Sequence, residues 1–195
     1  MTNVLKTTSY PGPRGPVVLV IMDGIGIGKY EEGDAVRTAL TPHMDWLKHN
    51  GLYSQLKAHG TAVGLPSDDD MGNSEVGHNA IGCGRVFAQG AKLVSAAIEN
   101  GSMFSGSVWQ SLVANCVTHG SAMHFIGLFS DGNVHSHVEH LQAMLRQAKA
   151  ESVTTARIHI LLDGRDVGET SALDYVDPFE DFLAELNADG VDFRI

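Results

Sequence analysis

Three apolar runs in this chain are each followed by an Asp-Gly pair, and this pattern constrains the fold more than any other feature. The runs cover 17–22, 122–129 and 158–162, and the pairs are Asp23-Gly24, Asp131-Gly132 and Asp163-Gly164. Short continuous apolar runs rich in β-branched residues are typical of strands that helices cover on both faces. Segments with helical patterns alternate with these runs, which predicts an α/β protein with parallel strands.

The remaining segments fit this alternation. We expect helices over 42–50, from near Ser74, and over 91–99, 108–118, 137–149 and 171–188, a short strand over 53–58, and a further strand from Val191. Thr41 suits an N-cap and Pro42 suits a first helical position. Residues 59–73 form a long Gly- and Asp-rich loop, and such loops are often functional. Because ligands bind beyond the carboxyl ends of strands in open α/β sheets, we expect a site at the Asp-Gly pairs.

Composition excludes several classes of partner. The formal net charge of -10 disfavours non-specific binding to nucleic acid or to acidic membranes. It is compatible with an anionic small substrate, because bound metal ions reverse the local field. The cysteines Cys83 and Cys116 are far apart in the sequence, so a reducing compartment is expected. No apolar run approaches the length of a membrane span. Residues 1–16 lack an apolar signal core, so we expect a cytoplasmic protein.

Ser74 lies where the acidic loop is expected to become a helix. A serine there is either an ordinary helix N-cap or a nucleophile, since the N–H groups of a helix start stabilise an incoming phosphoryl group. A serine nucleophile needs a base or a metal to activate it, and no GxSxG pattern surrounds Ser74. His78 lies on the same helix face and either orients Ser74 or packs as an ordinary helix histidine; the structural role is favoured.

Two other strand ends carry candidate ligands. Asp23 is either a turn residue or a carboxylate ligand of a hard divalent cation. His135 and His137 form an HxH pattern, which is a weak metal signal without acidic partners. His135 is the better candidate and would bind an anionic substrate, because His137 can instead begin the following helix.

The third Asp-Gly pair leads into Arg165 and Asp166. A surface ion pair is the simple interpretation of these two residues. In the functional interpretation, Arg165 makes two parallel hydrogen bonds to a phosphate or carboxylate. Asp166 would then accept a proton from a substrate hydroxyl.

Together these motifs resemble those of the N-terminal part of the cofactor-independent phosphoglycerate mutase family, within the alkaline-phosphatase superfamily. They occur in the family's order, from about Pro16 to the last residue. The matching signatures are Val20-Ile21-Met22-Asp23-Gly24, Met71-Gly72-Asn73-Ser74-Glu75-Val76-Gly77-His78-Asn79, Ser130-Asp131-Gly132-Asn133-Val134-His135-Ser136-His137 and Leu162-Asp163-Gly164-Arg165-Asp166-Val167.

The resemblance implies a role for each candidate. Ser74 would be the nucleophile that carries a phosphoserine intermediate. Asp23 and Ser74 would ligate one of two divalent metal ions, usually Mn²⁺, with Mg²⁺, Co²⁺ or Zn²⁺ as alternatives. His135, Arg165 and Asp166 would bind phosphoglycerate. The implied reaction interconverts 3-phosphoglycerate and 2-phosphoglycerate in glycolysis and gluconeogenesis, in a monomeric isomerase that needs no bisphosphoglycerate cofactor.

The implied fold is an alkaline-phosphatase-like parallel sheet with an inserted α/β phosphotransferase domain, both incomplete in 195 residues. We expect a lead-in over 1–15, the first segment of the metal-binding phosphatase-like domain over 16–88, and the truncated inserted domain over 89–195. Family members are far longer, and their C-terminal portion supplies further metal ligands, a lysine and substrate arginines. Arg194 is not given that arginine role. We therefore expect the chain alone to be a poorly folded, inactive fragment.

Two alternatives remain open. The Asp23 and Ser74 signatures alone would permit another metal-dependent phosphatase or phosphomutase of the same superfamily, such as a phosphopentomutase-like enzyme. The second alternative is a non-catalytic protein that keeps the anion-binding site without the chemistry.

Overall fold

The computed structural model describes residues 9–195. The chain divides into two compact units, and the boundary lies between Ser54 and Gln55. Residues 1–8 of the expected lead-in lie outside the described residues. In the first unit, α1 (Ala35–Thr38) begins at Asp34, whose Oδ1 accepts a hydrogen bond from the backbone N–H of Arg37 at 3.0 Å. α2 (Pro42–Asn50) has Thr41 as its N-cap and Pro42 in its first turn, as the sequence predicts.

Two of the predicted strands are wrong. Residues 17–22 form no strand, and Val18 and Leu19 are 78% and 68% exposed. Residues 53–58 form none either, and Leu56 is 85% exposed. A strand buried on both faces needs hydrogen-bonded neighbours and covering helices. The described part of the first unit contains no strand with which these runs could pair. Hydrophobicity alone therefore does not make them strands.

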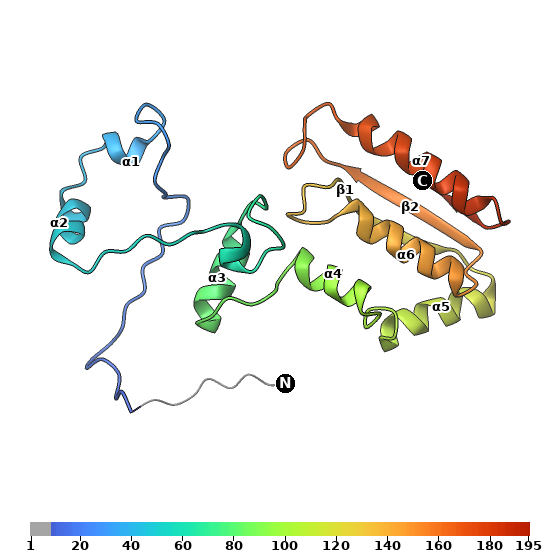
Figure 1. The fold of residues 1–195 in the computed structure, drawn as a ribbon, viewed down its shortest axis with the longest axis horizontal. Helices are drawn as coiled ribbons and strands as arrows, with labels where there is room; N and C mark the ends of the chain where they lie inside the picture. Colours follow the sequence, from blue (N-terminus) through green and yellow to red (C-terminus); the bar gives the residue numbers. More distant parts are fainter. Residues whose placement is uncertain (1–8) are drawn as a thin grey trace. The chain divides into compact units, whose positions relative to one another are not determined.

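The second unit contains a parallel three-stranded sheet, which confirms the predicted α/β class. Its strands are β1 (Met123–Phe129), β2 (Thr155–Leu162) and β3 (Asp192–Arg194), in the order β1-β2-β3. β2 begins three residues before the predicted strand over 158–162. The crossover helices are α6 (Val138–Ala150) and α7 (Ala172–Asn187), which run alongside the strands (Figure 1). This sequential order with right-handed crossovers places both helices on one face of the sheet.

Four further helical elements precede the sheet. They are η1 (Gly60–Val63), α3 (Ser74–Cys83), α4 (Ala91–Glu99) and α5 (Ser107–His119). Gly84 and Gly120 follow α3 and α5 with φ angles of 62° and 59°. This left-handed conformation is cheap for glycine and lets its N–H bond to the last turn of the helix. The α4 bounds agree with the predicted 91–99 helix.

The main core lies between the sheet and α5, α6 and α7. It includes Trp109 and Val113 of α5, Leu145 of α6, Ile158 of β2 and Phe179 of α7. In β2, Ala156 and Ile158 are buried whereas His159 and Leu161 are exposed. Among the described residues the sheet is therefore covered on one face. No helix in the described part of the chain has the length and apolar character needed to cross a membrane.

The core makes a direct prediction about stability. Leu145 is 0% exposed, so Leu145→Ala leaves a cavity and should lower the free energy of unfolding of the second unit by about 2–5 kcal/mol. Ile126→Ala in β1 is the control, because Ile126 is 75% exposed and its truncation should cost less than about 1 kcal/mol. Urea denaturation monitored by circular dichroism measures both. Equal losses in the two variants would contradict this placement of the core.

Candidate functional site

The carboxyl ends of β1 and β2 lie side by side, and two loops meet there. Phe129, the last residue of β1, is in register with Leu162, the last residue of β2. The loops that follow carry the second and third Asp-Gly pairs, as the sequence predicts. Their backbones approach closely, since a Cβ atom on Gly132 would lie only 2.6 Å from the Cβ of Asp166. A glycine is therefore required at this crossing.

Asp163 shapes the loop after β2. Its Oδ1 accepts hydrogen bonds from the backbone N–H groups of Arg165 at 2.9 Å and of Asp166 at 3.1 Å. These bonds, chiefly that from Arg165, hold the pKa of Asp163 below its ordinary value. The carboxylate thus stabilises the turn that presents Arg165 and Asp166.

The loop after β1 is also ordered by local bonds. His137 is the N-cap of α6, and its Nδ1 accepts a hydrogen bond from the backbone N–H of Glu139 at 3.2 Å. The HxH pattern therefore divides into a capping residue and an exposed residue, His135. The hydroxyl of Tyr175 in α7 donates to Asp131 Oδ1 at 2.7 Å, and this bond raises the pKa of Tyr175 to about 12.

Ser74 is the first residue of α3, and the helix N-cap is Asn73. The Asn73 Oδ1 accepts a hydrogen bond from the backbone N–H of Val76 at 3.0 Å. The interpretation of Ser74 as an ordinary N-cap is therefore wrong, because the preceding asparagine already serves that purpose. The Ser74 side chain is exposed beside the N–H groups of the first helical turn.

His78 contacts Ser74 one helical turn away. Its Nδ1 lies 2.7 Å from the Ser74 carbonyl oxygen and 3.1 Å from the Ser74 Oγ. A carbonyl oxygen can only accept a hydrogen bond, so Nδ1 carries the proton in this geometry. The same nitrogen cannot then take a proton from the serine hydroxyl. His78 is exposed and contacts Ser74, so the favoured interpretation of it as a packed helix histidine is wrong.

A buried glutamine holds α3 in place. Gln89 is 5% exposed, and its Nε2 donates to the carbonyl oxygens of Val63 at 2.9 Å and Val76 at 3.0 Å. These carbonyls belong to η1 and α3, whose apolar side chains Val63 and Val76 pack together with Leu65. One side chain thus joins the helix that bears Ser74 to the loop that precedes it.

The loop before Ser74 is bonded to the loop after β1. Asn133 Nδ2 donates to Asp70 Oδ1 at 2.7 Å, across 63 residues of sequence. In Figure 1 the loop between β1 and α6 extends toward the η1–α3 region. Hydrogen bonds from Asn133 and Ser67 hold the pKa of Asp70 below its ordinary value, although burial acts in the opposite direction.

These contacts enclose a groove of about 510 Å³. The loop before Ser74 forms one wall, and the loops after β1 and β2 form the other. Its lining residues are Met71, Gly72, Asn73, Leu128, Val134, His135, Asp163, Arg165 and Asp166. The structure therefore brings the candidates His135, Arg165 and Asp166 together, next to the loop that ends at Ser74.

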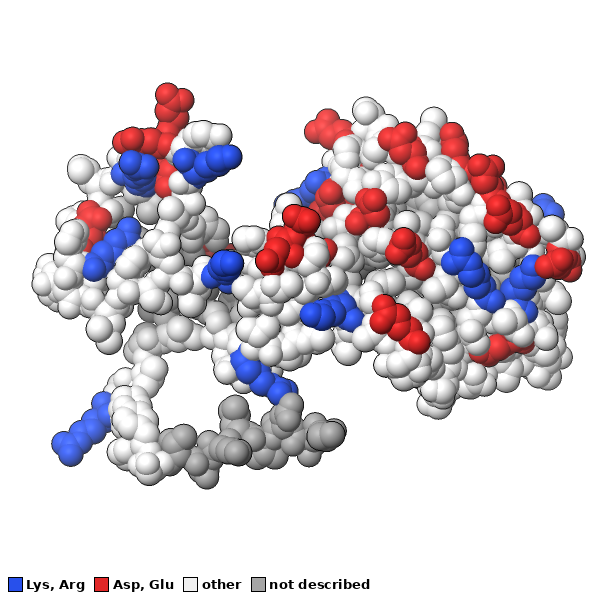
Figure 2. Space-filling model, in the orientation of Figure 1, with Lys and Arg blue, Asp and Glu red and all other residues white. Residues whose placement is uncertain are grey.

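The charges of the groove differ from those of the surrounding surface. Acidic side chains form a row along α7 (Figure 2). Within the groove, Asp163 bonds to backbone N–H groups. No ion pair among the described residues takes up the Arg165 guanidinium, which is exposed. Arg165 can therefore make two hydrogen bonds to a bound anion.

The two expected metal ligands lie in different units of the chain. Asp23 belongs to the first unit and Ser74 to the second, so a metal shared by them stays a prediction. Two oxygen ligands are too few for a divalent cation, which takes about six. Over residues 9–195, no group of three or more His, Cys, Asp or Glu side chains could hold a metal ion. The described residues alone do not fit a complete metal site.

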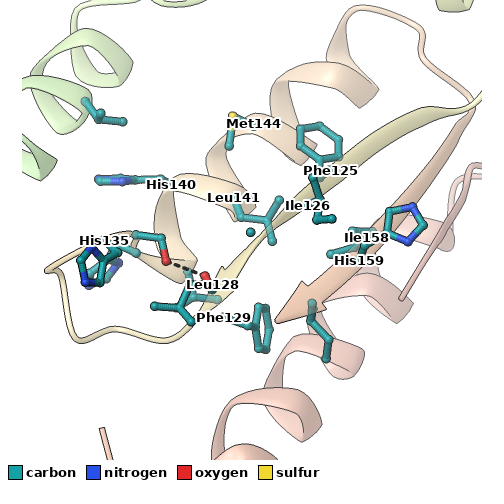
Figure 3. Close-up of a pocket in the computed structure, with 16 residues that line it drawn as sticks. Phe125, Ile126, Leu128, Phe129, His135, His140, Leu141, Met144, Ile158 and His159 are labelled. Atoms are coloured by element: carbon teal, nitrogen blue, oxygen red, sulfur yellow. Dashed lines mark hydrogen bonds between the residues drawn. The ribbon is translucent and has the colours of Figure 1, made fainter. Parts of the chain in front are cut away.

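A second, apolar cavity lies between α4, α6 and β1. Figure 3 shows Phe125, Leu141 and Met144 within it, and His135 and His140 on one side. His140 Nε2 lies 2.9 Å from Ser95 Oγ of α4, and burial lowers the pKa of His140. His140 therefore packs between α6 and α4.

Comparison with known proteins shows the family to which the chain belongs. The model of the family described as BPG-independent PGAM N-terminus (iPGM_N) matches residues 94–191, half of the chain. The chain belongs to this family. A "Probable 2,3-bisphosphoglycerate-independent phosphoglycerate mutase" from Leptospira interrogans is 51% identical over 181 residues, and the match covers 92% of this chain and 33% of that protein. The 2,3-bisphosphoglycerate-independent phosphoglycerate mutase of Trypanosoma brucei brucei is 47% identical over 187 residues, with 94% and 33% covered.

A solved structure from the same group of proteins has a similar fold. It is a Leishmania mexicana phosphoglycerate mutase, described at low cobalt concentration, with a TM-score of 0.78 and 44% identity. The match covers 89% of this chain and 32% of that one. The chain thus spans about one third of the length of the relatives that it matches.

Sequence reasoning missed four residues that shape this iPGM_N site: Asp70, Gln89, Gly132 and Asn133. Gly132 and Asn133 lie within a recognised motif, but no local pattern shows that their partners are Asp166 and Asp70. Gln89 lies outside the motifs that the sequence shows. Its two carbonyl partners could only be found from the fold.

The close crossing of the two loops predicts the effect of a single methyl group. Gly132→Ala places a Cβ against Asp166 and should lower the free energy of unfolding by about 1–3 kcal/mol. Gly127→Ala in β1 is the matched control, because a Cβ there meets nothing within 4 Å. Thermal and urea unfolding compare the variants. A destabilised Gly127→Ala beside an unchanged Gly132→Ala would contradict the crossing.

Asp163 predicts a dependence of stability on pH. The pKa of Asp163 is lower in the folded chain than in the unfolded chain. Asp163 therefore adds to the free energy of unfolding in full above the ordinary aspartate pKa of about 3.9, and this stabilisation is lost as the pH falls through the pKa of the folded state. Asp163→Asn should therefore show a smaller fall in unfolding free energy between about pH 5 and pH 2 than the unchanged chain. The exposed Asp181→Asn of α7 is the control and should follow the unchanged chain. Urea midpoints across the pH range measure this difference, which should be absent if Asp163 does not stabilise the loop.

Proposed function

We propose that this chain supplies the nucleophile and the substrate-binding residues of a 2,3-bisphosphoglycerate-independent phosphoglycerate mutase. The enzyme would interconvert 3-phosphoglycerate and 2-phosphoglycerate through a phosphoserine intermediate, in glycolysis and gluconeogenesis. The observation that carries this proposal is the groove in which His135, Arg165 and Asp166 meet the loop before Ser74. The names of the relatives support it.

Each groove residue has a task that its chemistry permits. The Arg165 guanidinium holds the carboxylate or phosphate of phosphoglycerate by parallel hydrogen bonds. His135 donates a hydrogen bond to the same anion. Asp166 gives a proton to the glycerate oxygen that leaves when Ser74 takes the phosphoryl group, and it takes a proton back from the glycerate hydroxyl that then attacks the phosphoserine. Holding the glycerate while its phosphoryl group is on Ser74 lets the group return to the other hydroxyl of the same molecule.

Ser74 is suited to accept the phosphoryl group. It is exposed at the first position of α3, where backbone N–H groups and the helix dipole favour negative charge. His78 fixes its orientation from the next turn. Because Nδ1 of His78 is occupied as a donor, activation of the hydroxyl must come from another group.

We propose two divalent metal ions as that group, with Asp23 and Ser74 among their ligands and Mn²⁺ as the favoured ion. Bound metals would lower the charge on the phosphoryl group and ionise the serine. The Leishmania mexicana structure is described with cobalt. The remaining ligands lie outside the set of described residues. A monomeric, cytoplasmic enzyme with no bisphosphoglycerate cofactor completes the proposal.

A chimera tests the proposal. In it, this chain replaces the matching third of the Leptospira interrogans relative. We expect turnover of 3-phosphoglycerate in the presence of manganese, and phosphoserine at Ser74 detected by mass spectrometry. Ser74→Ala should lower kcat by at least about 10³-fold with unchanged folding. Ser111→Ala in α5 is the matched control and should keep full turnover, because its hydroxyl bonds only to the Val108 carbonyl of its own helix.

Each alternative has its own outcome in this experiment. Preference for a pentose phosphate would favour another phosphomutase of the superfamily. Binding of phosphoglycerate without turnover or label would favour a non-catalytic anion-binding protein. Full turnover by the Ser74→Ala chimera would remove Ser74 from the nucleophile role.

A further inference from the structure

Asp70 anchors the loop that leads to Ser74. Its Oδ2 accepts hydrogen bonds from the Ser67 backbone N–H at 2.6 Å and from the Ser67 hydroxyl at 2.9 Å. Its carbonyl oxygen accepts from the Gly60 N–H at 3.1 Å, and the Gly60 carbonyl accepts from the Leu65 N–H at 3.1 Å. Residues 60–70 therefore form one hydrogen-bonded block. Asp70 is its last residue and connects it along the chain to Met71 to Ser74.

Asn133 is held in an unusual backbone conformation. Its φ angle is 58°, in the left-handed region that favours glycine and that asparagine tolerates better than most residues. A glycine there would meet the backbone requirement but would have no side chain. The asparagine amide instead donates to Asp70 Oδ1 at 2.7 Å. The side chain therefore provides a bond that the backbone conformation alone does not require.

The two residues connect the two walls of the groove. Asp70 lies four residues before Ser74, and Asn133 lies two residues before His135. The stretch between Asp70 and Ser74 is also held from its other side, because a Cβ on Gly72 would lie 2.0 Å from the Ala58 carbonyl oxygen. The Asp70–Asn133 bond therefore fixes the loop before Ser74 against the loop that carries His135, and the close packing of Gly72 holds the same loop on its other side.

We propose that Asp70 and Asn133 are a pair of positioning residues that set the distance between the nucleophile loop and the substrate-binding loop. This inference rests on the proposed function for the ligand that the groove takes. Neither residue touches the reacting atoms. The pair acts through the backbone of Met71 to Ser74 on one side and through Val134 and His135 on the other.

Exchange of the two side chains gives a sharp test in the 195-residue chain. Asn133→Asp alone places two carboxylates face to face and should weaken 3-phosphoglycerate binding by about fivefold to tenfold. Asp70→Asn alone replaces the carboxylate acceptor with a neutral amide and should also weaken 3-phosphoglycerate binding. In the double variant, the amide at position 70 can donate to the carboxylate at position 133, and its oxygen can still accept from Ser67. Binding should therefore return to within about twofold of the unchanged chain.

Amide hydrogen exchange provides a readout that does not depend on the ligand. Each single variant should speed exchange in both 71–76 and 133–137, and the double variant should restore protection in both. Asp69→Asn is the matched control, because among the described bonds only its backbone N–H is used, and it should change neither binding nor exchange. Titration by isothermal calorimetry measures the affinity.

The outcomes separate the two proposals. If the unchanged chain does not bind 3-phosphoglycerate but hydrogen exchange shows loss and rescue in both loops, substrate binding by this chain fails and the positioning pair stands. The inference is wrong if the loss of affinity in the double variant equals the product of the losses in the two single variants. It is also wrong if each single variant speeds hydrogen exchange only in its own loop, because the pair then does not couple the loops.

Discussion

The parallel pairing of β1 with β2 is the constraint on which the site depends. Because Phe129 and Leu162 are in register, the loops that follow them leave the sheet side by side. This brings Gly132 against Asp166 and places His135, Arg165 and Asp166 in one groove. A shift of the register by one residue would turn the alternate side chains to the opposite face and separate the loops. The core between the sheet and its helices fixes that register.

The side of the groove that leads to Ser74 is organised by hydrogen bonds rather than by a sheet. Asn73 caps α3, His78 orients Ser74 from the next turn, and Gln89 joins α3 to η1. The apolar cluster there contains only Val63, Leu65 and Val76 among its buried residues. A cluster this small buries little apolar surface, so the polar bonds carry more of the local order than they do in the main core.

The sequence predicts features that local pattern determines and misses those that depend on partners. Helix bounds such as 91–99 follow from apolar periodicity and glycine stops, and the structure confirms them. The run 17–22 is as apolar as a buried strand, but a strand also needs a hydrogen-bonded neighbour, which sequence composition does not supply. For Ser74, the sequence alone favours a cap, and the other motifs favour a nucleophile; the Asn73 hydrogen bond shows that Asn73 is the cap, and the nucleophile role stays a prediction. The Asp70–Asn133 bond joins residues too distant in sequence for any pattern to show.

The groove also shows how an acidic chain can offer a site to an anion. Asp70 and Asp163 lie beside it, and each carboxylate is stabilised by amide or hydroxyl donors, in Asp163 by backbone N–H groups and in Asp70 by Asn133 and Ser67. Neutral donors bond to both oxygens of Asp70 and to Oδ1 of Asp163 without using a cation. If Asp163 instead formed an ion pair with Arg165, the guanidinium would be neutralised before a ligand arrived, and its bidentate geometry would be lost. The turn bonds of Asp163 therefore shape the loop, and they also leave the Arg165 guanidinium available to an anion.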